Sequence, residues 1–91
     1  MSLNIEHDPQ TGRFGVVVDG QTCVLEYELV GKTMTITHTL VPSAVGGRGI
    51  AGDLVRTALE TARANGWKVI PACSYADAFM KKHREYADLL A

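Results

Sequence analysis

Long hydrophobic runs are missing from this 91-residue chain, and so is any surplus of charge. No apolar stretch approaches the roughly 18 residues that a membrane-spanning helix needs, so we expect no membrane anchor. The formal net charge is −1, from 9 basic and 10 acidic residues. Nucleic-acid-binding proteins usually carry a basic excess, so this composition argues against nucleic acid as a partner. The N-terminus lacks the basic and apolar regions of a signal peptide, and we expect a cytoplasmic protein.

Cysteine and histidine are also scarce. The two cysteines, Cys23 and Cys73, form no CxxC or other metal-ligand spacing. Without a secretory signal, both are expected to be reduced thiols. The three histidines, His7, His38 and His83, lie far apart in the sequence. We therefore predict no metal site.

The first half of the chain has the period-two pattern of β-strands. Asp19-Gly20 and Gly31-Lys32 are turn signals that separate three of these strands. The pattern predicts an antiparallel meander with strands at 3–8, 13–18, 22–30 and 34–41.

One face of each long strand is expected to meet the core. In 22–30 this face carries Cys23, Leu25, Tyr27 and Leu29, so Cys23 is interpreted as a core residue. In the next strand, the alternation places Met34, Ile36, His38 and Leu40 together on one face.

The second half changes to helical period. Ile50, Leu54, Val55, Ala58, Leu59 and Ala62 follow the spacing of an amphipathic helix, which Asn65-Gly66 should end. A short strand is predicted at 67–72, a helix at 75–83 and a helical tail at 85–90. Strand, helix and strand in this order favour a crossover to a parallel neighbour. We expect one α/β domain over 1–91, a mixed sheet with helices packed on it.

The junction between these halves, VPSAVGGRGIAG at 41–52, is the most informative segment. Gly46, Gly47 and Gly49 permit positive φ and close approach of a ligand. The first amides of a helix have no intrahelical partner, and the helix dipole adds positive charge there. The segment therefore predicts a site for a phosphate or pyrophosphate, to which Arg48 adds a forked cationic donor.

Four ordered motifs make the chain similar to the GNAT acetyltransferase superfamily, and within it to very small GNAT-like proteins. The motifs are HTLVP at 38–42, GGRGIA at 46–51, PACSY at 71–75 and KHREYADL at 82–89. The resemblance implies that two parallel strands splay apart and hold acetyl-CoA between them. It places the pantetheine arm against the backbone of Leu40, Val41 and Pro42. It places the pyrophosphate on the amides of the loop, Gly46, Gly47, Arg48, Gly49, Ile50 and Ala51.

Three positions depart from the family pattern. Gly46 stands where the loop has its first arginine, which should leave the backbone cradle intact with one charge contact fewer. Leu40 occupies a position where many relatives have glutamate, so no general base acts there. Arg84 replaces a proline in the tail. The helices that larger members insert between their first strands are also missing, so the acceptor site should be open, shallow or completed by a partner.

Cys73 is the first of three catalytic candidates. It follows the strand after the crossover, where ligands gather in open α/β sheets. The resemblance implies a role as nucleophile, or as proton donor to the departing thiolate. The alternative is a small buried apolar residue, because reactivity requires a lowered pKa.

His38 and Tyr75 are the other candidates. His38 has a pKa suited to a general base, but a histidine on an apolar face is more often structural. Tyr75 resembles the tyrosine with which many GNAT enzymes protonate the CoA thiolate. It is equally compatible with a structural aromatic at the start of a helix capped by Ser74.

Other basic and aromatic side chains bear on the cofactor. Arg48 is the first choice for the phosphates, with Lys82 as a further contact, although Lys81-Lys82 also fits a solvated helix face. Phe79 is interpreted as a core residue that can flank the pantetheine arm.

The predicted function is transfer of an acetyl group from acetyl-CoA to an amine, which would be a small amine, a polyamine or a protein lysine. Two alternatives remain open: a CoA- or acyl-CoA-binding module with little transferase activity, and an interaction domain that keeps only the fold. We expect a monomer or a weak dimer.

Overall fold

The structure is a computed structural model that describes residues 3–91. β1 (Glu6–Asp8), β2 (Arg13–Val18), β3 (Gln21–Val30) and β4 (Thr33–Leu40) form an antiparallel meander, and β5 (Lys68–Pro71) pairs in parallel with β4. The strands lie in the order β1-β2-β3-β4-β5. The predicted mixed sheet is confirmed.

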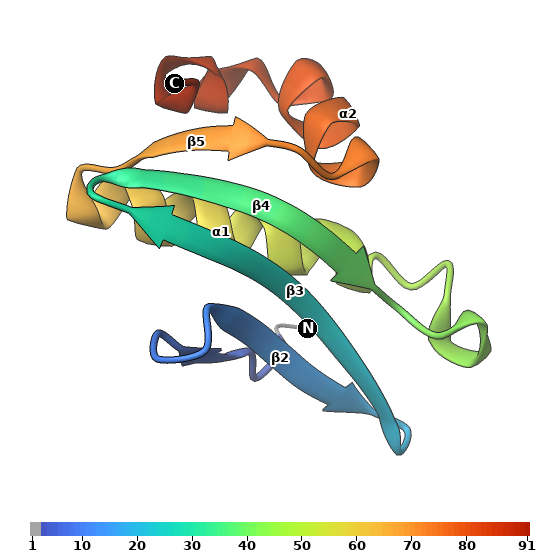
Figure 1. Cartoon of the computed structure of the whole chain (residues 1–91). Coiled ribbons are helices and arrows are strands. Elements are labelled where there is room, and N and C mark those ends of the chain that lie inside the picture. The colour runs from blue at the N-terminus through green and yellow to red at the C-terminus, as the bar shows by residue number, and fades with distance from the viewer. Residues whose placement is uncertain (1–2) are drawn as a thin grey trace.

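Helices cover one side of this sheet. α1 (Ile50–Asn65) is the crossover between β4 and β5, and α2 (Ser74–Lys82) follows β5. Two 3₁₀ segments, η1 (Ser43–Val45) and η2 (Arg84–Leu89), precede α1 and follow α2. In Figure 1, α1 runs behind the sheet, and the face turned toward the viewer is left uncovered by the helices of the described chain. We call this uncovered side the open face.

Turn and end signals in the sequence identify most boundaries. Asp19 and Gly20 both have positive φ, as a tight β2–β3 hairpin requires. Gly66 ends α1 with φ of 71°, and the next residue, Trp67, donates its backbone N–H to the carbonyl of Ala62. The largest difference is at β1, which is shorter than the predicted strand at 3–8 because its pairing with β2 spans only Glu6–Asp8.

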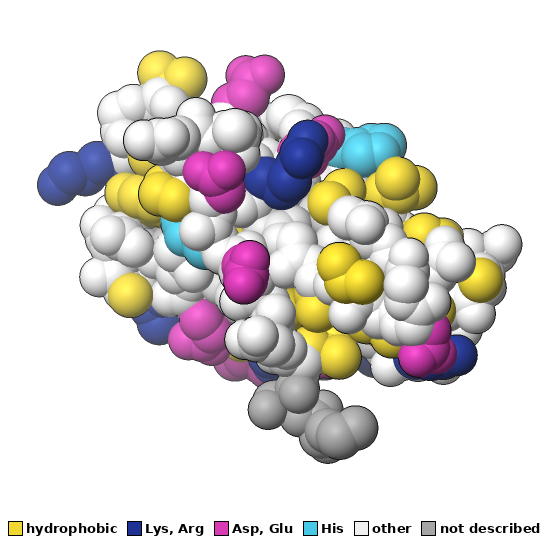
Figure 2. Space-filling view, turned by 90° about the horizontal axis from the view of Figure 1, so that it is seen from below, with side chains coloured by type: hydrophobic (Ala, Val, Ile, Leu, Met, Phe, Trp, Pro, Cys, Tyr) yellow, Lys and Arg dark blue, Asp and Glu magenta, His cyan; other side chains and the backbone are white. Residues whose placement is uncertain are grey.

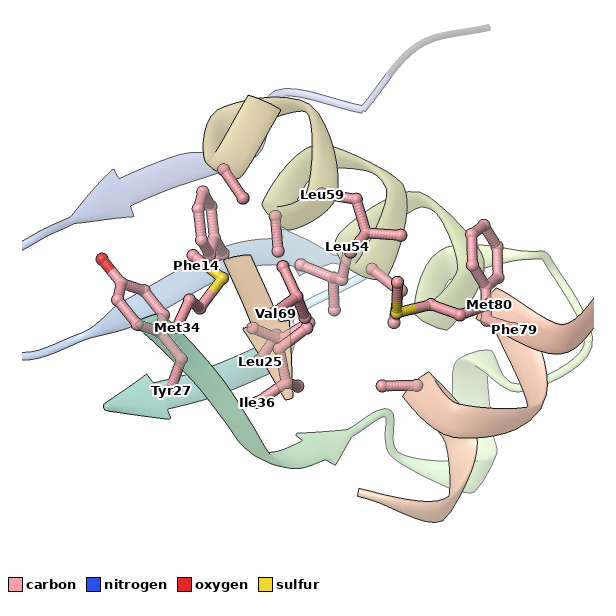
Figure 3. Close-up of a cluster of buried hydrophobic side chains, with 14 of the residues drawn as sticks. Phe14, Leu25, Tyr27, Met34, Ile36, Leu54, Leu59, Val69, Phe79 and Met80 are labelled. Carbon is pink, nitrogen blue, oxygen red and sulfur yellow. The ribbon is translucent and has the colours of Figure 1, made fainter. Parts of the chain in front are cut away.

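The core lies between the sheet and the helices. All six positions of the predicted apolar stripe of α1 are buried. Figure 3 shows Leu54 and Leu59 directed toward the sheet residues Leu25 and Val69. α2 and η2 contribute to the same cluster, which includes Phe79, Met80, Tyr86 and Leu89. Cys23 is fully buried as expected, whereas Leu29 is 41% exposed near the end of β3, outside the core that was predicted to include it.

A β-bulge in β4 changes the register with β3. Tyr27 lies opposite Ile36, but the next residue of β3, Glu26, lies opposite His38. Thr37 is thus the extra residue, and its hydroxyl donates a hydrogen bond to the Glu26 carbonyl. An inserted residue of this kind reverses the alternation of side chains beyond it.

The predicted single face for Met34, Ile36, His38 and Leu40 is therefore wrong beyond Ile36. Met34 and Ile36 are fully buried, while His38 and Leu40 are exposed. Leu40 lies opposite Val24, on the open face. The sequence pattern assumes regular pleating, and the bulge moves both residues from the core side to the solvent side.

Candidate functional site

β4 and β5 separate at their C-terminal ends. Their pairing ends with Ile36 opposite Pro71, and the Cys73 N–H still donates to the Ile36 carbonyl at 2.9 Å. β4 then continues to Leu40, while the segment after β5 turns into α2. The separation follows directly from the bulge and from the start of α2 at Ser74. The result is a gap in the sheet with exposed strand backbone on its β4 side.

The glycine-rich loop leads from β4 into α1. Buried Val45 anchors it, through a hydrogen bond from its N–H to the Pro42 carbonyl. Gly47 and Gly49 have φ of 77° and 78°, the left-handed region that favours glycine. A Cβ added at either would meet nothing within 4 Å, so there is room beside the loop. Gly46, with φ of −66°, does not adopt the positive φ that the sequence suggested.

Helix α1 begins with unpartnered amides. The first backbone bond of the helix runs from Asp53 N–H to the Gly49 carbonyl. The N–H groups of Ile50, Ala51 and Gly52 precede it and have no partner within the helix. No side chain caps this end of the helix. These amides, together with the space beside Gly49, are suited to an anionic group.

Arg48 does not point freely into solvent. Its guanidinium forms an ion pair of 2.6 Å with Asp19, in the β2–β3 turn. Both side chains are at least half exposed, so the pair is accessible to water and salt. Arg48, the side chain predicted to bind a phosphate, is thus paired with the Asp19 carboxylate in this structure.

A cleft of about 410 Å³ opens beside the start of α1. It lies between α1 and α2, and its cationic side chains are Arg56 and Lys82. Arg56 also stacks over the Phe79 ring, 5.4 Å from its centroid, which holds the guanidinium on the cleft wall. The full lining is Gly49, Gly52, Asp53, Arg56, Tyr75, Ala78, Phe79, Lys82 and His83.

Lys82 and Phe79 are both predicted site residues, and the cleft brings them together with Gly49. Sequence reasoning missed Arg56, although a signal exists. Gly49, Gly52, Asp53 and Arg56 have i, i+3, i+4, i+7 spacing, which marks a second stripe on α1 away from its apolar face.

Cys73 occupies the N-cap position of α2, which sequence reasoning assigned to Ser74. Ser74 is the first residue of the helix instead. The Cys73 sulfur lies 3.6 Å from the Thr39 hydroxyl, across the gap between the strands. The thiol is partly exposed, in contrast to the buried Cys23.

The surroundings of Cys73 favour the thiolate. Burial raises the pKa of the Cys73 thiol. The backbone N–H of Ala76 and the hydroxyl of Thr39 act in the opposite direction, as do the backbone N–H groups of Tyr75 and Thr39. Together these donors outweigh burial and bring the pKa below its usual value. The bulge and the N-terminus of α2 therefore combine to stabilise a negative sulfur.

The other two catalytic candidates lie apart. Tyr75 lines the cleft between the helices, and its hydroxyl is 3.3 Å from where a Cβ of Gly52 would be. A side chain at Gly52 would thus crowd that hydroxyl. His38 is on the open face, opposite Glu26. The structure gathers Cys73 and Tyr75 at the start of α2 and places His38 on the other side of β4.

Two features are absent from residues 3–91. No three His, Cys, Asp or Glu side chains of this region come close enough to hold a metal ion. Within the same region, no helix combines the length and apolar character needed to cross a membrane.

Comparisons with known proteins agree on one family. The sequence profile of the GCN5-related N-acetyltransferases matches residues 13–89. Protein NATD1 of Xenopus tropicalis is 36% identical over 85 residues, which cover 90% of this chain and 78% of that protein. Protein NATD1 of Mus musculus is 37% identical over 84 residues, which cover 89% and 76%.

A solved structure has the same fold. The solution structure of a GCN5-like protein from Staphylococcus aureus, named as a candidate N-acetyltransferase, superposes with a TM-score of 0.77. The match covers 100% of this chain and 91% of that one, at 29% sequence identity.

Proposed function

Because the chain belongs to the GCN5-related N-acetyltransferase family, we propose that it binds acetyl-CoA and transfers the acetyl group to an amine. The observation that carries the proposal is the combination of two features at one end of the sheet. The strands β4 and β5 separate there, and free helix amides stand directly beside the gap. The expected arm and pyrophosphate of the cofactor require these two features side by side.

The proposed placement uses the residues predicted from sequence. Backbone of Leu40, Val41 and Pro42 would pair with the pantetheine arm. The amides from Gly46 to Ala51 would hold the pyrophosphate. The cleft between α1 and α2 would take a further part of the cofactor, with Arg56 and Lys82 near its phosphates. Asp53 also lines this cleft and opposes anion binding, so the two cations are needed there.

Acetyl transfer needs an amine without its proton, a polarised carbonyl and close approach of the two. Acetyl-CoA supplies the activated thioester. The Cys73 thiolate can attack the acetyl carbonyl carbon as the carbon–sulfur bond to CoA breaks, and the amine then attacks acetyl-Cys73 and restores the thiolate. The lowered pKa of Cys73 favours this route over proton donation by its thiol. Tyr75 is the better placed donor of a proton to the CoA sulfur.

Thermal unfolding with and without acetyl-CoA tests binding. Ligand at about 100 times its Kd adds roughly 2.7 kcal/mol if only the native state binds. For a chain of this size that corresponds to a rise in Tm of roughly 10–20 °C. Gly49→Glu should abolish the rise, because it adds a carboxylate at the cradle. Gly31→Glu, in the β3–β4 turn, is the matched control at another glycine with positive φ and open surroundings. Absence of a shift at millimolar acetyl-CoA contradicts the proposal.

Intact-mass spectrometry tests the role of Cys73. Mixing with acetyl-CoA should add about 42 Da, one acetyl group, and Cys73→Ala should abolish the adduct. An unchanged adduct in the variant excludes Cys73 as the nucleophile.

A CoA-binding module without transferase activity is the second candidate. Leu40 favours it, because its exposed apolar side chain stands where many relatives carry a glutamate base. His38, two residues away on the same face, is the remaining candidate base. Release of CoA thiol that depends on an added amine excludes this second candidate.

A further inference from the structure

Two rows of side chains cross the open face from β1 to the end of β4. In the first row, Glu6 lies opposite Gly15, Gly15 opposite Val24, and Val24 opposite Leu40. It is continuous because each pair is in direct register, and it ends where β4 separates from β5. Gly15 contributes no side chain, so the row is hollowed in the middle.

The second row runs alongside and is charged. Asp8 lies opposite Arg13, and Arg13 opposite Glu26, to which it forms an ion pair of 2.7 Å. Glu26 in turn lies opposite His38. Arg13, the one cation among these strand partners, is already paired with Glu26. The carboxylates of Glu6 and Asp8 therefore leave the β1 end negatively charged.

The hollow in the first row belongs to a cleft of about 600 Å³. Its walls come from the N-terminal segment and β1, including Leu3, Glu6 and Asp8, and its floor includes Gly15, Val17 and Val24. The middle of the lining, at Gly15, Val17 and Val24, is apolar. Arg13 also lines the cleft, but it is paired with Glu26, so the carboxylates of Glu6 and Asp8 leave the β1 end with a net negative charge. Figure 2 views the molecule from below Figure 1, so the open face is seen edge-on, and acidic and hydrophobic side chains are exposed near one another in this view.

We propose that this cleft binds the acceptor, an elongated linear diamine whose far amino group lies against Glu6. The apolar middle of the molecule would cover Gly15 and Val24. The other amino group would extend past Val24, beyond the cleft lining, to Leu40 and His38 beside the gap between β4 and β5. Three strand spacings of about 4.8 Å give a span of roughly 14 Å, so short diamines cannot contact both ends.

This inference rests on the proposed transferase function for the reaction at the near end. The binding of the diamine itself rests only on the cleft, its acidic end and its length. The two can therefore be tested separately.

Titration of the isotope-labelled full chain with decamethylenediamine, followed by NMR, tests the binding. The amide signals of Gly15 and Val24 should move saturably. Glu6→Gln should weaken binding about 3- to 5-fold, the range of an exposed ion pair. 1,10-Decanediol has the same chain length and no ammonium group, so it should bind wild-type protein as weakly as the diamine binds Glu6→Gln. Glu28→Gln, a carboxylate of β3 outside the cleft, is the matched control and should change nothing.

Gly15→Val is the steric test. A Cβ at Gly15 would meet its neighbours at ordinary distances of 3.7 and 3.9 Å, so the strand accommodates a side chain. The valine would fill the floor of the cleft and should weaken binding about tenfold or more. Far-ultraviolet circular dichroism checks that the variant folds, and Glu6→Gln decides the question if it does not.

Equal binding of decamethylenediamine and 1,10-decanediol, or binding that Glu6→Gln leaves unchanged, overturns the proposal. The acetylation reaction supplies a second readout, in which Glu6→Gln should raise the KM for the diamine and leave the Tm shift with acetyl-CoA intact. If acetyl-CoA gives no Tm shift even in the wild type, the proposed function fails, and the NMR titration still decides whether the cleft binds the diamine.

Discussion

At the scale of single residues, Cys73 shows how one atom depends on several elements. Its thiol donates a hydrogen bond to the Thr39 hydroxyl in β4. As a thiolate, the sulfur would accept from this hydroxyl and from backbone N–H groups at the start of α2. Burial disfavours the thiolate, but these donors outweigh it. The other cysteine, Cys23, is fully buried in β3. The reactivity of the two thiols should therefore differ strongly.

Thr39→Val tests the contribution of one of these donors. The substitution keeps the shape of the side chain and removes the hydroxyl that stabilises the thiolate. The pKa of Cys73 should rise, so the thiolate fraction at any pH below that pKa should fall. The rate of alkylation by iodoacetamide, measured as a function of pH, should shift to higher pH.

Thr37→Val is the control for this experiment. The Thr37 hydroxyl donates to the Glu26 carbonyl and is not among the groups that shift the pKa of Cys73. An alkylation profile that is the same in wild type and Thr39→Val would show that the hydroxyl does not contribute.

At the scale of secondary-structure elements, the ends of α1 depend on glycine for different reasons. Gly49 has positive φ beside the proposed cofactor site, whereas Gly66 has positive φ where the chain must leave the helix. The buried stripe between them was predictable, because six apolar residues at helical spacing leave one face to bury.

Gly66→Ala should lower the free energy of unfolding by about 1 kcal/mol, because alanine resists the left-handed conformation. Urea unfolding measures the loss directly, and Tm should fall by roughly 4–8 °C. Gly46→Ala is the control, since Gly46 has φ of −66° and a Cβ there would have ordinary contacts. Equal losses in both variants would contradict this account.

At the scale of the whole molecule, the ion pair between Arg48 and Asp19 joins two distant turns. It connects the glycine loop before α1 with the β2–β3 hairpin. The pair is exposed, so it adds little to stability. Its main consequence is that Asp19 engages the Arg48 guanidinium, which is the group expected to contact the pyrophosphate.

Asp19→Asn releases Arg48 for a phosphate. Asn tolerates the φ of 50° at this position, so the turn should persist. If acetyl-CoA binds as proposed, its affinity should rise about 2- to 5-fold, as judged by isothermal titration calorimetry. Arg48→Gln should lower the affinity, and unchanged affinity in both variants would show that Arg48 does not contact the ligand.

The sequence by itself determined the mixed sheet, the crossover helix and the loop at its start. These depend on local spacing and on glycine, which act over a few residues and can be identified without knowing what lies opposite. The tertiary structure decided which side of β4 each candidate faces. The bulge depends on how β3 pairs with β4, so the pattern in β4 alone could not reveal that His38 and Leu40 face away from the core.

The same reason applies to the remaining surprises. The pairing of Arg48 with Asp19 joins residues far apart in the chain. The donors around Cys73 come from two elements that meet only after folding. The row from Glu6 to Leu40 exists only because four strands align in register. Local pattern determines the elements, whereas contacts between strands and turns determine where the chemistry-bearing side chains meet.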